Sequence, residues 1–113
     1  MTQGWDTHED GDTVVVALEG DLDISNAASL EAELERLESA QPNLIVLDFR
    51  KAGFVDSTGL SLILNADARA RKAGRRLQIV SGEAGVLERL LKTIGLYERL
   101  EVIKEPPPAT GNA

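Results

Sequence analysis

The pattern of apolar and polar positions predicts strands that alternate with helices along most of the chain. Short runs rich in β-branched and aliphatic residues are typical of strands. They occur at residues 13–19, 44–49, 77–80 and 100–103, and we expect the run at 3–8, which carries Trp5, to be an edge strand. Leucines spaced three or four positions apart are typical of helices, which we expect to begin after Ser25 or Asn26, at Asp56 or Ser57, and at Glu83.

The order of these elements predicts an α/β fold. Gly11 supplies a turn that joins the first two runs into an N-terminal hairpin. Residues 44–49 are an almost continuous apolar run, which is typical of a strand buried on both faces. Strand–helix alternation after the hairpin indicates a mixed sheet of four or five strands with right-handed crossovers. We expect the helices mainly on one side of that sheet.

The helices have predicted inner and outer sides. In the first helix, Leu30, Leu34 and Leu37 recur at helical spacing, and the glutamates between them are expected to be solvated. In the second helix, one side is expected to carry Leu60, Ile63, Leu64, Asp67, Ala68 and Arg71. In the third helix, Leu87, Leu90, Leu91 and Ile94 are expected to face inward. Gly74 and Gly95 are expected to end these two helices. A basic cluster is expected to be a solvated helix end, where cations favour the helix dipole; it comprises Arg69, Arg71, Lys72, Arg75 and Arg76.

The distribution of proline predicts one domain and a tail. All four prolines lie at positions 42, 106, 107 and 108, so none interrupts the region between residues 43 and 105. We expect residues 1–104 to form the domain and residues 105–113 to be a disordered Pro-rich tail.

Composition removes many kinds of chemistry. The 113 residues include no Cys and one His, which excludes disulfides and thiol nucleophiles and leaves little material for metal or Ser-His-Asp sites. The formal net charge of −7 disfavours binding to nucleic acid or to an anionic membrane surface. No apolar run approaches the ~20 residues of a membrane helix, and the N-terminus lacks a signal-peptide pattern. We therefore expect a cytoplasmic protein.

The segment from Phe54 to Leu60 is the main candidate site. It places Asp56, Ser57 and Thr58 between a buried strand and an amphipathic helix, where an acid or hydroxyl side chain can cap the free amides. Many helices begin in this way without any further function. A hydroxyl at a helix start is also exposed, and the helix dipole there tolerates negative charge. Phosphate on Ser57 would then change a surface without unfolding the helix.

These residues give the chain a resemblance to a known family. From about Thr13 to Val102 it resembles a STAS domain of the bacterial anti-sigma factor antagonist type. The resemblance depends on the strand at 14–18, the turn Gly20-Asp21-Leu22-Asp23, the strand at 45–48 and above all Val55-Asp56-Ser57-Thr58-Gly59-Leu60.

The resemblance implies a phosphorylation switch. The unphosphorylated chain would bind an anti-sigma factor that is also an ATP-dependent serine kinase, and so release a sigma factor. Phosphorylation of Ser57 would weaken that complex, and a metal-dependent serine phosphatase would reset it. The protein would then be a kinase substrate and not an enzyme, with no cofactor and no metal site of its own.

The resemblance also assigns roles to the residues around Ser57. Asp56 would position the Ser57 hydroxyl or contact the kinase, and Thr58 would be a secondary hydroxyl. Gly59 would let the partner approach the backbone. Asp21 and Asp23 match the family's acidic loop, which faces the partner.

Three other interpretations compete with this one: an enzyme and a receiver domain are disfavoured, and a STAS subunit is the alternative. An enzyme would need a base for Ser57, and the only histidine, His8, lies in a polar N-terminal segment where we expect it to be exposed. A phospho-aspartate receiver would use Asp48 as its acceptor, with Asp21 and Asp23 as an acidic pair. A STAS subunit of a lipid or anion transporter, or of a stress-signalling scaffold, would use the same fold as a docking module.

Overall fold

The computed structural model describes residues 4–82 and 85–106, which form one five-stranded sheet with three α-helices. The strands lie in the order β1-β2-β3-β4-β5. β1 pairs with β2 antiparallel, and every later pair is parallel. The element bounds are β1 Trp5–Asp10, β2 Thr13–Leu22, α1 Ala27–Glu38, β3 Leu44–Val55, α2 Ser57–Ala73, β4 Arg76–Val80, α3 Val86–Thr93, η1 Tyr97–Arg99 and β5 Glu101–Ile103.

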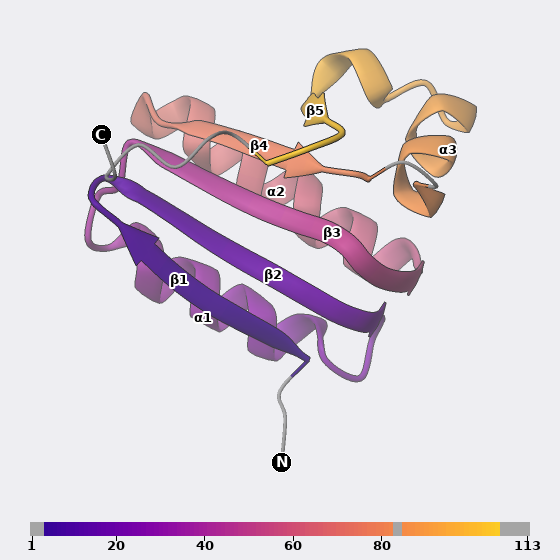
Figure 1. Ribbon diagram of the computed structural model, residues 1–113, viewed down its shortest axis with the longest axis horizontal. Helices are drawn as coiled ribbons and strands as arrows, with labels where there is room; N and C mark the ends of the chain where they lie inside the picture. Colours follow the sequence, from indigo (N-terminus) through magenta and orange to yellow (C-terminus); the bar gives the residue numbers. More distant parts are fainter. Residues whose placement is uncertain (1–3, 83–84, 107–113) are drawn as a thin grey trace.

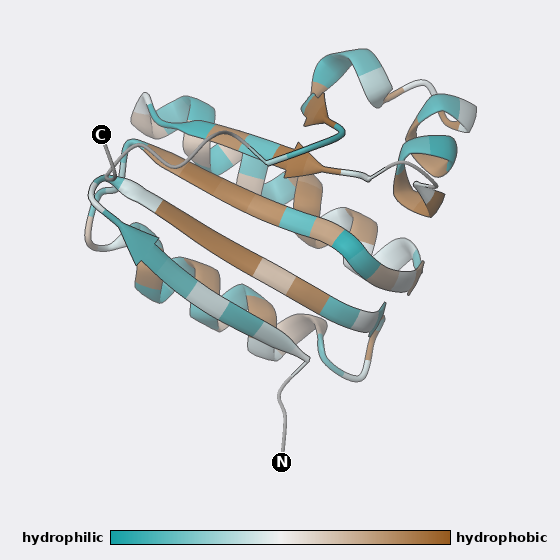
Figure 2. Ribbon diagram, in the orientation of Figure 1, coloured by the Kyte–Doolittle hydropathy of each residue, from teal (hydrophilic) through white to brown (hydrophobic). Residues whose placement is uncertain are grey.

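The α-helices gather on one face of the sheet, as predicted. Figure 1 shows α1 and α2 behind β1–β4, with α3 near the ends of β3 and β4, and no helix of the described residues covers the opposite face. The core between the layers is aliphatic, and Leu30, Ile45, Leu47 and Ile63 in it are fully buried. Figure 2 shows this as apolar bands along the middle of β2 and β3, beside the hydrophilic edge strand β1. The predicted α/β fold class with an N-terminal hairpin is confirmed.

Two strands run further than the sequence pattern predicts. β2 continues to Leu22 and β3 to Val55, although the apolar runs stop near residues 19 and 49. Backbone pairing between the two strands continues to Leu22 and Val55, across two shifts of register. The side-chain pattern therefore underestimates the length of these strands. Their ends carry exposed polar residues and are stabilised by backbone pairing with each other.

The inner side of α2 differs from the predicted one. Of the predicted set only Ile63 is fully buried, whereas Ala68 and Arg71 are exposed. The buried residues are Gly59, Leu62, Ile63, Ala66 and Ala70. Small residues at three of these positions let α2 lie close to the sheet, and a search for large apolar residues overlooks them.

The end of α3 explains why Ile94, predicted to face inward, is 42% exposed. Gly95 has a φ of 80°, and the Leu96 amide donates to the carbonyl of Leu91 at 2.9 Å. This is the pattern of a left-handed helix cap, in which the residue after the glycine packs back on the last turn. Leu96 therefore packs against the core in place of Ile94. Gly74, with φ 74°, ends α2 as predicted.

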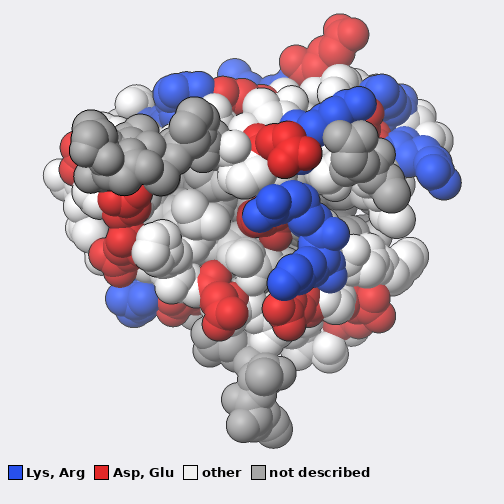
Figure 3. All heavy atoms as spheres, in the orientation of Figure 1, with Lys and Arg blue, Asp and Glu red and all other residues white. Residues whose placement is uncertain are grey.

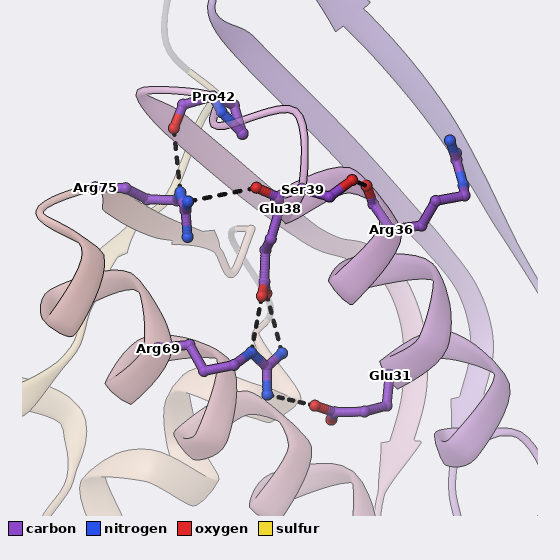
Figure 4. Close-up of polar contacts among 7 residues, drawn as sticks. All are labelled: Glu31, Arg36, Glu38, Ser39, Pro42, Arg69 and Arg75. Atoms are coloured by element: carbon purple, nitrogen blue, oxygen red, sulfur yellow. Dashed lines mark hydrogen bonds and ion pairs between the residues drawn. The ribbon is translucent and has the colours of Figure 1, made fainter.

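The glutamates of α1 and the basic cluster are not simply solvated, which corrects the prediction for both. Arg69 on α2 binds Glu38 at 2.8 Å and also pairs with Glu31, so that one guanidinium joins two carboxylates of α1 (Figure 4). Arg75 donates to the carbonyls of Pro42 and Glu38. Together these contacts join the C-terminal ends of α1 and α2.

Two predictions fall wholly or partly outside the described residues. Glu83, the predicted start of the third helix, is not described, and α3 begins at Val86. Of the predicted tail at 105–113, only Glu105 and Pro106 are described.

Candidate functional site

The predicted site lies where β2 and β3 end and α1 and α2 begin. The Asp56 amide donates to the carbonyl of Leu22 at 3.1 Å, so the chain enters α2 directly beside the end of β2. This contact brings Asp21, near the end of β2, and Asp23, in the β2–α1 loop, to the same end of the sheet as Ser57.

Asp56 is the N-cap of α2, one of the two caps that the sequence predicts. Its backbone is extended, with φ −92° and ψ −174°, and its carboxylate accepts a hydrogen bond from the Gly59 amide at 2.9 Å. An acidic cap both satisfies a free amide and complements the positive end of the helix. The carboxylate is thereby turned toward the helix backbone.

Ser57 is the first residue of α2, and it is exposed. Within the described part of the chain its hydroxyl forms no hydrogen bond. Thr58, the next residue, is half-buried. Ser57 therefore presents a free hydroxyl to solvent beside the open amides of a helix start.

Gly59 packs against the end of β2, which is a role that the sequence did not predict. It is buried, and a Cβ at this position would lie 2.8 Å from Cγ and 2.9 Å from the carbonyl oxygen of Leu22. Real Cβ contacts are not this short, so a side chain here would push α2 away from β2. Glycine is required at this position by packing under the site.

Asp23 organises the loop between β2 and α1. Its carboxylate accepts hydrogen bonds from both the amide and the hydroxyl of Ser25, and these bonds lower the pKa of Asp23 below its usual value. Asn26 is the N-cap residue of α1, but its side chain contacts the loop backbone instead of the helix amides. It accepts from the Asp23 amide and donates to the carbonyl of Asp21, each at 2.9 Å.

Asp21 binds the backbone of the neighbouring strand. Its carboxylate accepts a hydrogen bond from the Phe54 amide at 2.8 Å. The bond spans an irregular part of the ladder, where Gly20 pairs with Ala52 but Leu22 pairs with Val55, so β3 carries an extra residue. This is the arrangement of a β-bulge, which bends a strand and re-aims its side chains.

Sequence reasoning missed two apolar residues at this end of the molecule. Ile24 is 79% exposed and Phe54 is 62% exposed, the two highest values among the exposed large hydrophobic residues described. Ile24 lies in the Asp23 loop and Phe54 lies three residues before Ser57. Phe54 stands at the start of the candidate segment, and this position was the available signal, but only the acid, the hydroxyls and the glycine of that segment were given roles.

The receiver-domain alternative does not match this geometry. Asp48 lies within β3, level with Ala17 of β2, whereas Asp21 and Asp23 lie beyond the next register shift. The Asp48 carboxylate is taken up by Arg50, with bonds of 2.7–3.1 Å. Burial raises the pKa of Asp48, but these bonds outweigh it and leave the pKa below its usual value. Among the described residues, no group of three or more His, Cys, Asp or Glu could hold a metal ion.

The remaining surface carries the single histidine and a mixture of charges. His8 is exposed on β1, and Trp5 is buried. On the open face of the sheet, Lys and Arg lie among Asp and Glu and do not form an all-basic area (Figure 3). Within the described residues, no helix has the length and apolar character needed to cross a membrane.

Comparison with known proteins identifies the family and the fold. A family model described as "Mlab, STAS domain" matches residues 5–103. An anti-sigma factor antagonist from Mycobacterium paratuberculosis is 19% identical, with a TM-score of 0.79 over 89% of this chain and 85% of that one. The Bacillus cell fate determinant SpoIIAA, solved in its phosphorylated form, is 19% identical, with a TM-score of 0.70 over 89% and 92%.

A third similar structure comes from a different kind of protein. A sulfate transporter family protein from Wolinella succinogenes is 21% identical, with a TM-score of 0.71 over 83% of this chain and 78% of that one. At these identities the three structures share the fold with this chain, and the site must be judged from its own residues.

Proposed function

Because this chain belongs to the STAS domain family, we propose that it is an anti-sigma factor antagonist controlled by phosphorylation of Ser57. In its unphosphorylated form it binds an anti-sigma factor that is also an ATP-dependent serine kinase, and the sigma factor bound by that kinase is released. Phosphorylation of Ser57 by the kinase ends the complex. A metal-dependent serine phosphatase restores the binding form.

The free Ser57 hydroxyl is the observation that carries this proposal. It is exposed at the first position of α2 and forms no hydrogen bond within the described residues, so a kinase can reach it without opening the fold. The cap of the helix is Asp56, not Ser57. Phosphorylation therefore leaves the capping hydrogen bond in place, and Asp56 acts mainly by setting the position from which Ser57 projects.

The same geometry explains how a phosphate would act. It adds a charge of about −1.5 to −2 at a helix start, where the dipole tolerates it. The new charge lies at the end of the sheet that already carries Asp21, Asp23 and Asp56, none of which forms an ion pair within the described residues. Binding would require burial of a strongly hydrated dianion beside exposed apolar side chains, which is costly. The complex weakens while the fold persists.

The proposal also covers the domain boundary, the tail and the absence of chemistry in the chain itself. We propose that the domain ends near residue 104 and that residues 105–113 form a tail outside it. The kinase supplies ATP and catalysis, so the chain itself acts without a cofactor, a metal or an enzymatic activity of its own, in the cytoplasm and without direct contact to nucleic acid or membrane. Thr58, half-buried beside Ser57, is a poorer acceptor because its side chain is less accessible.

The direct test is phosphorylation by the cognate anti-sigma kinase, purified from the source organism, with ATP and mapping by mass spectrometry. We expect phosphate on Ser57 of the wild type and none on Ser57→Ala. Ser61→Ala is the matched control, because Ser61 is an exposed serine one helical turn further along α2. Phosphate on Ser61, Thr58 or elsewhere, or unchanged labelling of Ser57→Ala, would refute the site.

The similarity to a sulfate transporter family protein and the "Mlab" description of the family model favour a second candidate. In it, the chain is a STAS subunit of a lipid or anion transporter, or of a stress-signalling scaffold, and docks a partner without a serine kinase. The genomic neighbourhood separates the two: a kinase-like anti-sigma gene supports the antagonist, and transporter genes support the subunit.

A further inference from the structure

The geometry points to Phe54 and Ile24 as the apolar contact that the partner buries, and to Asp21 as the positioning residue that holds Phe54 in place. This inference deepens the proposed function and rests on it for the identity of the partner. It also changes the role of Asp21 from a charge that faces the partner to a support within this chain.

The exposure of the apolar residues locates the contact. Ile24 and Phe54 are 79% and 62% exposed, ahead of Val86 at 52% and Ile94 at 42% on and after α3. Ile24 lies in the loop after β2, and Phe54 is the next-to-last residue of β3. The pairing of Leu22 with Val55 brings the ends of these two strands together. Scattered exposed apolar residues are common on protein surfaces. Two at the end of the sheet that carries the Ser57 hydroxyl form a contact area that phosphorylation can control.

The charges around this pair indicate the chemistry of the partner. The carboxylates of Asp23 and Asp56 bind backbone or hydroxyl groups and form no ion pair within the described residues. A matching partner surface has an apolar recess for Phe54 and Ile24 with Lys or Arg at its rim. Complementary charges of this kind guide association and fix orientation more than they add affinity.

The position of Phe54 depends on Asp21 and Gly53. The Asp21 carboxylate holds the Phe54 amide at 2.8 Å across the bulge in β3. A Cβ on Gly53 would lie 2.6 Å from the same carboxylate oxygen, so only glycine leaves room for this hydrogen bond. Because the Asp21 carboxylate bonds to the backbone of β3, it fixes the position of the backbone from which Phe54 projects.

A pair of variants separates a positioning role from a charge role at Asp21. Asp21→Asn removes the charge but keeps a carbonyl oxygen that can accept the Phe54 amide, whereas Asp21→Ala removes the acceptor. We expect the Phe54 amide to exchange with solvent at nearly the wild-type rate in Asp21→Asn and at least tenfold faster in Asp21→Ala. This readout needs no partner. Equal exchange in wild type and Asp21→Ala would overturn the positioning role.

The contact itself is tested by photo-crosslinking of the full chain in cells of the source organism. Phe54→p-benzoylphenylalanine and Ile24→p-benzoylphenylalanine are compared with the same substitution at Val86 and Ile94, followed by identification of the crosslinked protein by mass spectrometry. We expect crosslinks from positions 24 and 54 to the anti-sigma kinase. Crosslinks only from 86 or 94, or from none of the four, would overturn the inference.

Binding to the purified crosslinked partner completes the test. We expect Phe54→Ala and Asp21→Ala to weaken affinity at least tenfold, and Val86→Ala and Asp21→Asn to change it less than threefold. Unchanged affinity in Phe54→Ala, or equal losses in Asp21→Asn and Asp21→Ala, would refute the inference even if Ser57 is phosphorylated. A partner without kinase activity that passes these tests would support the contact and refute the proposed function.

Discussion

The two ends of α2 differ in whether their side chains are bonded within the chain. At the C-terminal end, Arg69 and Arg75 are bound to carboxylates and carbonyls of α1 and of the loop that follows it (Figure 4). At the N-terminal end, the Ser57 hydroxyl is free within the described residues, and Phe54 just before it is largely exposed. One end fixes α2 to its neighbours, and the other presents a surface.

This difference indicates that one end of α2 stabilises the fold and the other end binds a partner. Polar groups that bond within the chain make it more rigid and are not available to bind a partner. An unbonded hydroxyl and exposed apolar side chains are available to a partner. A modification at Ser57 can then change binding with little change in folding. Mutations at the two ends should therefore affect stability and binding separately.

The largest expected effect on stability is at Arg69. Its side chain is 29% exposed, and those of its partners Glu31 and Glu38 are 27% and 12% exposed. Arg69→Ala would leave two partly buried carboxylates without their cation, which we expect to lower the free energy of unfolding by about 2–3 kcal/mol. Urea denaturation measures this change. Partner affinity should stay within threefold of the wild type.

Arg36→Ala is the control for this prediction. Arg36 pairs with Glu33 on the surface of α1, its side chain is 62% exposed, and such pairs contribute about 0–1 kcal/mol. Equal destabilisation by Arg36→Ala and Arg69→Ala would show that the network between α1 and α2 has no special role.

The next effect concerns packing beneath the site. Gly59→Ala would place a Cβ 2.8 Å from Cγ of Leu22, and overpacking of this kind costs about 1–3 kcal/mol. Thermal unfolding checks this, with the exposed Ser61→Ala as a control that should stay within about 0.5 kcal/mol. Wild-type stability in Gly59→Ala would mean that α2 can shift freely from β2.

Loss of the N-cap should have a smaller effect. Asp56→Ala removes the acceptor of the Gly59 amide, and the loss of such a cap costs about 1 kcal/mol. Asp56→Asn, which is also a good cap, should recover most of this stability. If Asp56→Asn is as unstable as Asp56→Ala in urea denaturation, the carboxylate has a role other than capping.

The smallest change in stability is expected at Ser57 itself. Ser57→Asp adds one charge at an exposed helix start, so the free energy of unfolding should stay within about 0.5 kcal/mol of the wild type. Affinity for the kinase should fall. A variant that loses both stability and binding would show that Ser57 supports the fold.

The sequence predicted the parts of the molecule whose physics is local. The N-cap at Asp56, the left-handed cap at Gly74 and the buried leucines of α1 each depend on neighbouring residues and are confirmed. The resemblance to the STAS family, which the family model confirms, depended on residues 14–18, 20–23, 45–48 and 55–60.

Features that depend on contacts across the chain were not predictable in this way. Glu31 and Glu38 have the pattern of a solvated helix side until α2 brings Arg69 between them. The bond from Asp21 to Phe54 joins residues 33 positions apart and depends on a bulge that the side-chain pattern does not reveal. Only the structure reveals these contacts. They underlie both the rigid C-terminal end of α2 and the proposed partner contact at its N-terminal end.

The most direct test compares the chain with and without phosphate on Ser57 in two measurements on the same samples. These are the affinity for the purified anti-sigma kinase by calorimetry and the Tm of the free chain. We predict that phosphorylation weakens binding about a hundredfold and leaves the Tm within about 2 °C. Unchanged affinity, or a loss of affinity accompanied by unfolding, would contradict a switch that acts on the surface alone.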